Sequence, residues 1–125
     1  MNKRNLLPIV VLVLASLACG LSANQPQGSS SGAVDGEKLF QQSGCSGCHS
    51  GNGGQGPSLA GIYGEEVPLE NGETVAADEA YLRESILDPS AKIVEGYQPI
   101  MPEYRDQMND EQVDALVAYI RSLSD

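Results

Sequence analysis

Large aromatic side chains are scarce in this sequence of 125 residues, which contains no tryptophan, one phenylalanine and five tyrosines. So few bulky side chains bury little apolar surface in a core. This favours an interior that a bound non-protein group helps to fill. The length leaves room for one compact domain and argues against a large multidomain enzyme.

Basic side chains are also few. Seven lysines and arginines stand against 17 acidic residues, for a formal net charge of −10. Recognition of nucleic-acid phosphates depends on lysine and arginine, so we expect no nucleic-acid partner. The same charge would be repelled by an anionic membrane surface.

The first 18 residues are predicted to be an export signal. Lys3 and Arg4 precede an apolar run that is too short to cross a bilayer comfortably as a helix. The run ends in Leu-Ala-Cys-Gly, which resembles the lipobox of lipoproteins and predicts lipid attachment at Cys19. We therefore expect an exported protein, lipid-anchored at the outer face of the cytoplasmic membrane or in the periplasm. An uncleaved signal anchor and a secreted protein with an unpaired thiol are the alternatives.

Residues 19–32 are predicted to be a lipid-anchored flexible linker, because they are rich in glycine, serine and glutamine and poor in apolar side chains. The folded domain is predicted over residues 33–125. Removal of the signal takes away Lys3 and Arg4 and no acid, so the mature chain carries a formal charge of −12. This charge predicts partners with basic docking patches, or weak contacts that are sensitive to salt.

The motif that carries chemistry is Cys45-Ser46-Gly47-Cys48-His49, the C-x-x-C-H pattern of c-type haem attachment. Two thiols at this spacing reach the two vinyl groups on one edge of a porphyrin, and the adjacent imidazole can bind the iron. The sequence therefore predicts one covalent haem c. A thioredoxin-like pair lacks a βαβ pattern around it, and a tetrahedral zinc site lacks a fourth ligand near the motif.

The second iron ligand cannot be histidine, because His49 is the only one in the sequence. It must be another side chain, or be absent. Met101 is the favoured candidate, because prolines on both sides hold residues 97–102 in an extended segment that can present a thioether to a flat ring. Three other side chains remain alternatives: Met108, Lys38 and Lys92.

Local patterns predict the helices of the domain. A short helix is expected from Asp35, a second from Asp78 to about residue 87, and a third after Asn109 with apolar residues at helical spacing. Asn71-Gly72 is typical of a two-residue hairpin turn. Residues 51–56 match G-x-G-x-x-G formally, but no strand precedes them and no helix follows, so no nucleotide site is expected.

Residues 33–125 resemble the class I, mitochondrial-type cytochromes c. Segments 69–72, 77–86 and 96–102 look most like the haem domains fused to subunit II of caa3-type oxidases. The resemblance implies an all-α fold of three to four helices around one covalent haem, with a small β-hairpin. The copper-binding domain of subunit II needs a second cluster of cysteine and histidine that this sequence lacks, so we expect a free-standing relative.

The same resemblance implies roles for individual residues. Cys45 and Cys48 would bear the haem, and His49 and Met101 would bind its iron. The carbonyl of Pro57 would accept a hydrogen bond from His49 and fix the imidazole. Pocket-wall or propionate contacts are implied for two tyrosines, Tyr63 and Tyr97.

An iron with protein ligands in both axial positions has no place for a substrate, so the expected protein is an electron carrier and not an enzyme. We expect redox partner proteins, a donor and a terminal oxidase or other acceptor, which meet the carrier in small, transient contacts. Two alternatives are a haem-bearing subunit fixed in an oxidase or dehydrogenase complex, and a haem enzyme or gas-binding protein with an open iron.

Overall fold

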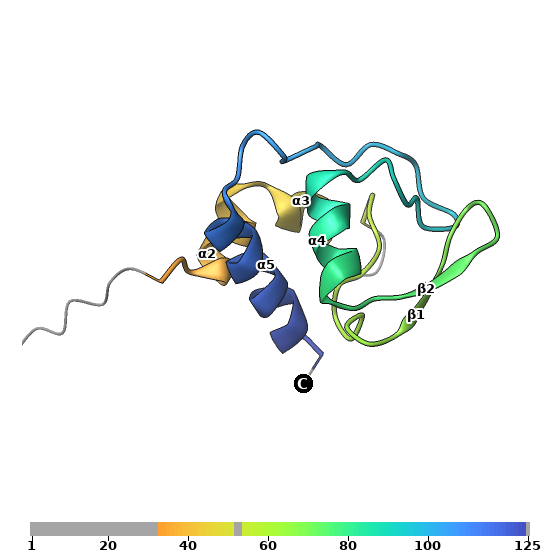
Figure 1. Ribbon diagram of the computed structural model, residues 1–125, viewed down its shortest axis with the longest axis horizontal. Helices are drawn as coiled ribbons and strands as arrows, with labels where there is room; N and C mark the ends of the chain where they lie inside the picture. Colours follow the sequence, from red (N-terminus) through yellow and green to blue (C-terminus); the bar gives the residue numbers. More distant parts are fainter. Residues whose placement is uncertain (1–32, 52–53, 125) are drawn as a thin grey trace, which may run out of the picture. The chain divides into compact units, whose positions relative to one another are not determined.

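The computed structural model describes residues 33–51 and 54–124, and Figure 1 shows it as a ribbon. The predicted export signal (1–18), the predicted linker (19–32) and the predicted lipidation site, Cys19, lie outside the described residues. Within the described ranges the chain forms four helices and one two-stranded sheet, as expected for an all-α domain with a small hairpin. No helix in this part of the chain is long and apolar enough to cross a membrane.

Helices α2 (Gly36–Gln42) and α3 (Cys45–Cys48) follow each other with a short turn between them. Asp35 caps α2, because its carboxylate accepts a hydrogen bond from the Lys38 backbone N–H over 3.0 Å. Gly44 then adopts a φ of +78°, the left-handed conformation that glycine enters without steric cost. The chain can therefore reverse direction and begin the single turn of α3 at once.

Helix α5 (Asp110–Ser122) begins at the predicted capping box. The Asn109 side chain accepts a hydrogen bond from the Gln112 backbone N–H over 2.9 Å, and the Gln112 side chain accepts one from the Asn109 N–H over 3.0 Å. Two helix-start donors are thus satisfied reciprocally. The buried stripe of α5 has the predicted helical spacing: Val113, Leu116, Val117 and Ile120.

Helices α2 and α5 pack against each other (Figure 1). Gly36 lies so close to α5 that a β-carbon at this position would overlap the carbonyl oxygen of Ala115. One turn further along α2, the Phe40 ring meets the Tyr119 ring with 5.3 Å between centroids and a 54° tilt, an arrangement that aromatic pairs favour. The close approach of the two helices therefore depends on the missing side chain at Gly36.

Helix α4 (Glu79–Leu87) also packs against α5. It starts at Asp78, whose carboxylate accepts a hydrogen bond from the Tyr81 backbone N–H over 2.8 Å. It ends at Asp88, because the residue before Pro89 avoids the helical region. Arg83 ties the outer face of α4 to α5 through ion pairs with Asp110 and Asp114.

Strands β1 (Glu66–Pro68) and β2 (Thr74–Ala76) form the antiparallel hairpin. The expected two-residue turn is wrong: five residues, 69–73, connect the strands, with Gly72 in the left-handed region at φ +84°. Leu69 stays hydrogen-bonded within the hairpin, because its N–H donates to the Glu73 carbonyl over 2.8 Å, and it also forms an isolated bridge with Val94. On either side of this bridge, the Glu70 N–H donates to the Ile93 carbonyl and the Glu95 N–H donates to the Pro68 carbonyl. These contacts with residues 93–95 stabilise a hairpin that is too short to be stable alone.

Candidate haem site

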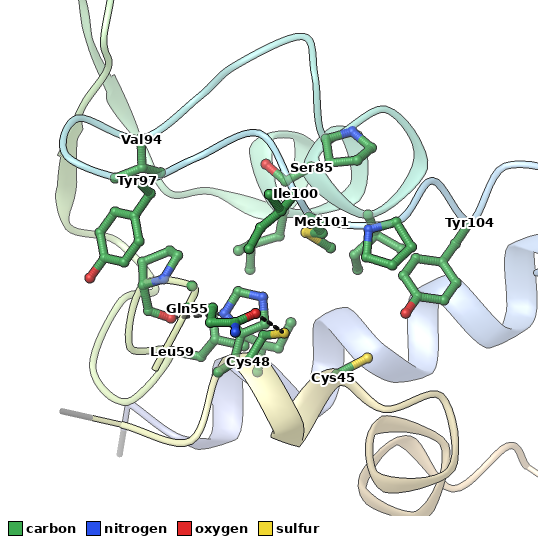
Figure 2. A pocket seen from close by; sticks show the side chains of 18 of the residues that line it. Cys45, Cys48, Gln55, Leu59, Ser85, Val94, Tyr97, Ile100, Met101 and Tyr104 are labelled. Atoms are coloured by element: carbon green, nitrogen blue, oxygen red, sulfur yellow. Dashed lines mark hydrogen bonds between the residues drawn. The ribbon is translucent and has the colours of Figure 1, made fainter. Parts of the chain in front are cut away.

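A cavity of about 390 Å³ opens on one side of the core. It lies between α3, α4 and the segment that carries Met101, and Figure 2 shows it from close by. Its volume is within the range of about 300–1,000 Å³ that ligand sites occupy. Much of its lining is apolar, including Leu59, Ile62, Leu82, Ile86, Leu116 and Ile120.

Helix α3 brings both cysteines of the motif to this cavity. Cys45 and Cys48 are three residues apart, so they share one face of the single helical turn. Neither forms a disulfide. Burial is the main cause that raises the pKa of the Cys45 thiol above its ordinary value.

The imidazole of His49 lines the same cavity, and a hydrogen bond sets its tautomer. Its Nδ1 atom lies 2.8 Å from the carbonyl oxygen of Pro57. A carbonyl oxygen only accepts, so Nδ1 donates the proton and Nε2 keeps the lone pair that can bind a metal. Gly56 allows this contact, because a β-carbon there would lie 2.7 Å from Cε1 of the ring.

Met101 enters the cavity from the extended segment between two prolines, and Figure 2 shows its sulfur turned toward the cavity. Two of the alternative ligands line the cavity as well. The Lys92 ammonium is ion-paired with Glu84, which disfavours it as an iron ligand. Met108 lies just before α5 and packs against the core. Lys38 is not part of the lining.

The two tyrosines implied by the family resemblance lie in different surroundings. Tyr97 is half-buried and lines the cavity, where Figure 2 shows it beside Val94. Tyr63 is not among the lining residues. The Arg121 guanidinium instead lies over the Tyr63 ring, 5.7 Å from its centroid. The structure therefore brings Cys45, Cys48, His49, Tyr97 and Met101 together with Pro57, and leaves Tyr63 apart.

Sequence reasoning missed Tyr104, which is buried in the cavity wall. Its hydroxyl donates a hydrogen bond to the backbone carbonyl of Ser43 over 3.0 Å. Burial raises the pKa of Tyr104, and the nearby Cys45 raises it further. No signal in the sequence could have found it, since the charged residues on both sides of it are typical of an exposed loop.

Ser85 contributes the one buried side-chain nitrogen or oxygen atom in the described ranges that lacks a hydrogen bond. Its hydroxyl oxygen is buried in the cavity wall and has no hydrogen-bond partner. Its place was predictable, because Ser85 lies one turn from Tyr81 on the inner face of α4. A second polar lining residue, Gln55, has its amide oxygen 3.8 Å from the Cys48 sulfur.

These donors fit an iron porphyrin. The apolar walls suit a flat macrocycle, the paired thiols can form thioethers along one edge, and Nε2 of His49 is free to bind iron. The thioether of Met101 supplies a second soft ligand in the same cavity. Together these features define a domain built to hold one c-type haem.

Comparison with known proteins agrees with this assignment. The family model "Cytochrome c" matches residues 33–124. The chain is 34% identical over 110 residues to "Cytochrome c oxidase subunit 2" of Alkalihalophilus pseudofirmus, a match that covers 83% of this chain and 29% of that protein. The chain thus spans less than a third of the length of this curated relative. A solved structure, cytochrome cH from Methylobacterium extorquens, is similar with a TM-score of 0.49 and 29% identity, covering 72% of this chain and 97% of that one.

The chain belongs to the cytochrome c family. The all-α prediction is confirmed, with the class I cytochrome c fold and a small hairpin. The predicted cofactor is also confirmed: the protein carries a covalently attached haem c. It is accordingly a haem electron-transfer protein.

Proposed function

We propose that the protein is a membrane-tethered electron carrier with a single haem whose iron is held between His49 and Met101. The observation that carries the proposal is the hydrogen bond from His49 Nδ1 to the Pro57 carbonyl, because it leaves Nε2 free in a cavity that also holds a thioether. When bound, haem supplies an iron that gains and loses one electron. Cys45 and Cys48 hold the group covalently.

The protein's own residues set the conditions for rapid electron transfer. The Pro57 carbonyl holds the imidazole in one orientation, so little has to move when the charge of the site changes. The apolar lining excludes water from the cavity. A neutral thioether from Met101 favours the reduced state and places the potential towards the high end of the range for protein haems.

Two protein ligands to the iron would make the protein a carrier and not an enzyme. With His49 and Met101 in place, no position is left for a substrate or a gas. A haem enzyme or gas-binding protein would need one side of the cavity without a donor. Met101 and Met108 both supply a thioether to the lining, which disfavours this alternative.

A lipid on Cys19 would keep the carrier at the outer face of the cytoplasmic membrane, with residues 20–32 between the anchor and the domain. Shuttling along one membrane gives a high effective concentration and needs no tight binding. The similarity to a protein named cytochrome c oxidase subunit 2 supports a terminal oxidase as acceptor. The same similarity favours a second candidate, a haem-bearing subunit fixed in an oxidase complex.

The ligand assignment is tested by replacing each cavity methionine in turn. We expect Met101→Ala to remove the far-red absorption that sulfur gives ferric haem and to make the ferrous protein bind carbon monoxide. The midpoint potential should fall by about 100 mV, a fraction of the roughly 0.8 V over which axial ligands shift haems. Met108→Ala is the matched control and should change none of these. Equal effects from both variants would contradict the assignment.

A further inference from the structure

Charged side chains are missing from two segments that border the haem cavity. Residues 39–64 contain no Asp, Glu, Lys or Arg, and neither do residues 96–102, although 19% of the whole chain is charged. The first segment includes the haem-attachment motif and the second includes Met101. The fold brings these two distant segments to the same cavity.

The exposed part of the cavity lining is uncharged throughout the described residues. It consists of six residues, called here the uncharged rim: Gly44, Gln55, Gln98, Pro99, Ile100 and Pro102. Ile100 is 55% exposed and is the one large hydrophobic side chain exposed in this part of the protein. The remaining charge in the described lining is Lys92, which is neutralised by its ion pair with Glu84.

One exposed acid, Glu103, directly follows the rim residue Pro102 and is ion-paired with Arg105, whereas others gather elsewhere on the domain. One exposed group lies on and beside the hairpin and includes Glu66, Glu70 and Glu73. Another lies at the start of α5, where Glu111 follows Asp110, the partner of Arg83. A partner with a basic patch would be drawn to these groups and not to the rim.

We propose that the uncharged rim is the docking surface for a redox partner whose own contact surface is apolar and uncharged. The proposal rests on the proposed function, because the rim surrounds the cavity that holds the haem. The centre of a protein interface is depleted of charge and enriched in apolar contacts, and the rim already has this composition. The partner surface that we propose is therefore uncharged, whereas the net charge alone predicts a partner with a basic docking patch.

An uncharged contact makes electron transfer insensitive to salt. The first test measures oxidation of the reduced holoprotein by two small complexes, anionic hexacyanoferrate(III) and cationic tris(phenanthroline)cobalt(III). Between about 0.1 M and 1 M salt, where the Debye length falls from about 10 Å to about 3 Å, we expect each rate to change less than about twofold. A rate that rises several-fold for the anion and falls for the cation would show that the acidic groups govern the site, and would overturn the proposal.

The second test uses the native partner, supplied as respiratory membranes of the organism that encodes the chain. Ile100→Glu and Gln98→Glu place a charge on the rim, whereas Thr74→Glu adds the same charge to the exposed strand β2. We expect the rim variants to slow oxidation of the reduced protein by the membranes about fivefold or more. Thr74→Glu should leave the rate unchanged.

Unchanged far-red absorption and midpoint potential verify that the haem ligands of the rim variants are intact. Ile100 is adjacent to Met101, so Ile100→Glu could disturb this ligand directly. Gln98→Glu adds the same charge to the rim at a residue that is not adjacent to Met101. Equal slowing by Thr74→Glu and the rim variants would overturn the proposal. If the membranes fail to oxidise the wild-type protein while the small complexes do, the assignment of an oxidase as acceptor fails, and the salt series with the complexes still decides the character of the rim.

Discussion

The tight contact between α2 and α5 predicts that Gly36→Ala destabilises the protein strongly. A β-carbon at Gly36 would overlap the Ala115 carbonyl oxygen and would lie 2.8 Å from the carbonyl carbon and 2.9 Å from the Tyr119 β-carbon. Two of these neighbours are backbone atoms of a regular helix. They can move only if the whole of α5 moves, so no side-chain rotation relieves the overlap.

The size of the effect follows from two opposing contributions. Overpacking in a well-packed core costs about 1–3 kcal/mol, and a backbone neighbour places this site at the upper end. Alanine regains up to about 1 kcal/mol of helix propensity over glycine. The net loss is therefore about 2 kcal/mol, which lowers the melting temperature of a domain of this size by about 8–16 °C.

The assay is thermal unfolding of the purified holoproteins, followed by far-ultraviolet circular dichroism and by haem absorption. Gly47→Ala is the matched control, because Gly47 is also helical and its β-carbon would meet no atom within 4 Å. We expect the control to stay within about 0.5 kcal/mol of the wild type. A Gly36 variant that melts together with the control would refute the close packing of α2 against α5.

Three further predictions concern the haem ligand, the core and the anchor. Gly56→Ala should push the His49 ring off its hydrogen bond to the Pro57 carbonyl, seen as a changed electron paramagnetic resonance spectrum, whereas Pro57→Ala keeps that carbonyl and should leave the spectrum intact. Burial raises the pKa of Tyr81 above its ordinary value of 10.0. The neutral form of Tyr81 therefore stabilises the fold below pH 10, and this contribution is lost as the pH rises through the raised pKa. When the pH is raised above 10, the free energy of unfolding in urea should fall less for Tyr81→Phe than for the wild type. An equal fall in both proteins would count against the burial argument. Cys19→Ser should move the protein from the membrane fraction to the soluble fraction, and retention in the membrane would contradict lipidation.

Local sequence signals predicted most of the elements and the attachment motif. Asp35, Asp78 and Asn109 were identifiable as helix caps because each one acts on backbone groups only a few residues away. The same holds for Cys45 and Cys48, whose spacing within one turn is a property of the sequence itself.

Contacts between distant segments could not be predicted in this way. The hydrogen bond from Tyr104 to Ser43 spans 61 residues, and the bridge between Leu69 and Val94 joins the hairpin to a distant loop. Neither leaves a periodic or compositional trace. The uncharged rim was predictable only in part. The sequence shows its two uncharged segments, but only the fold shows that both border one cavity.

The most direct test of the central claim is a redox titration of the purified protein, followed optically, with and without carbon monoxide. An iron held by both His49 and Met101 predicts a one-electron titration whose midpoint is the same in both atmospheres, because the gas finds no free position. A midpoint that rises under carbon monoxide, with a changed ferrous spectrum, would mean that one axial position is open and would contradict the account.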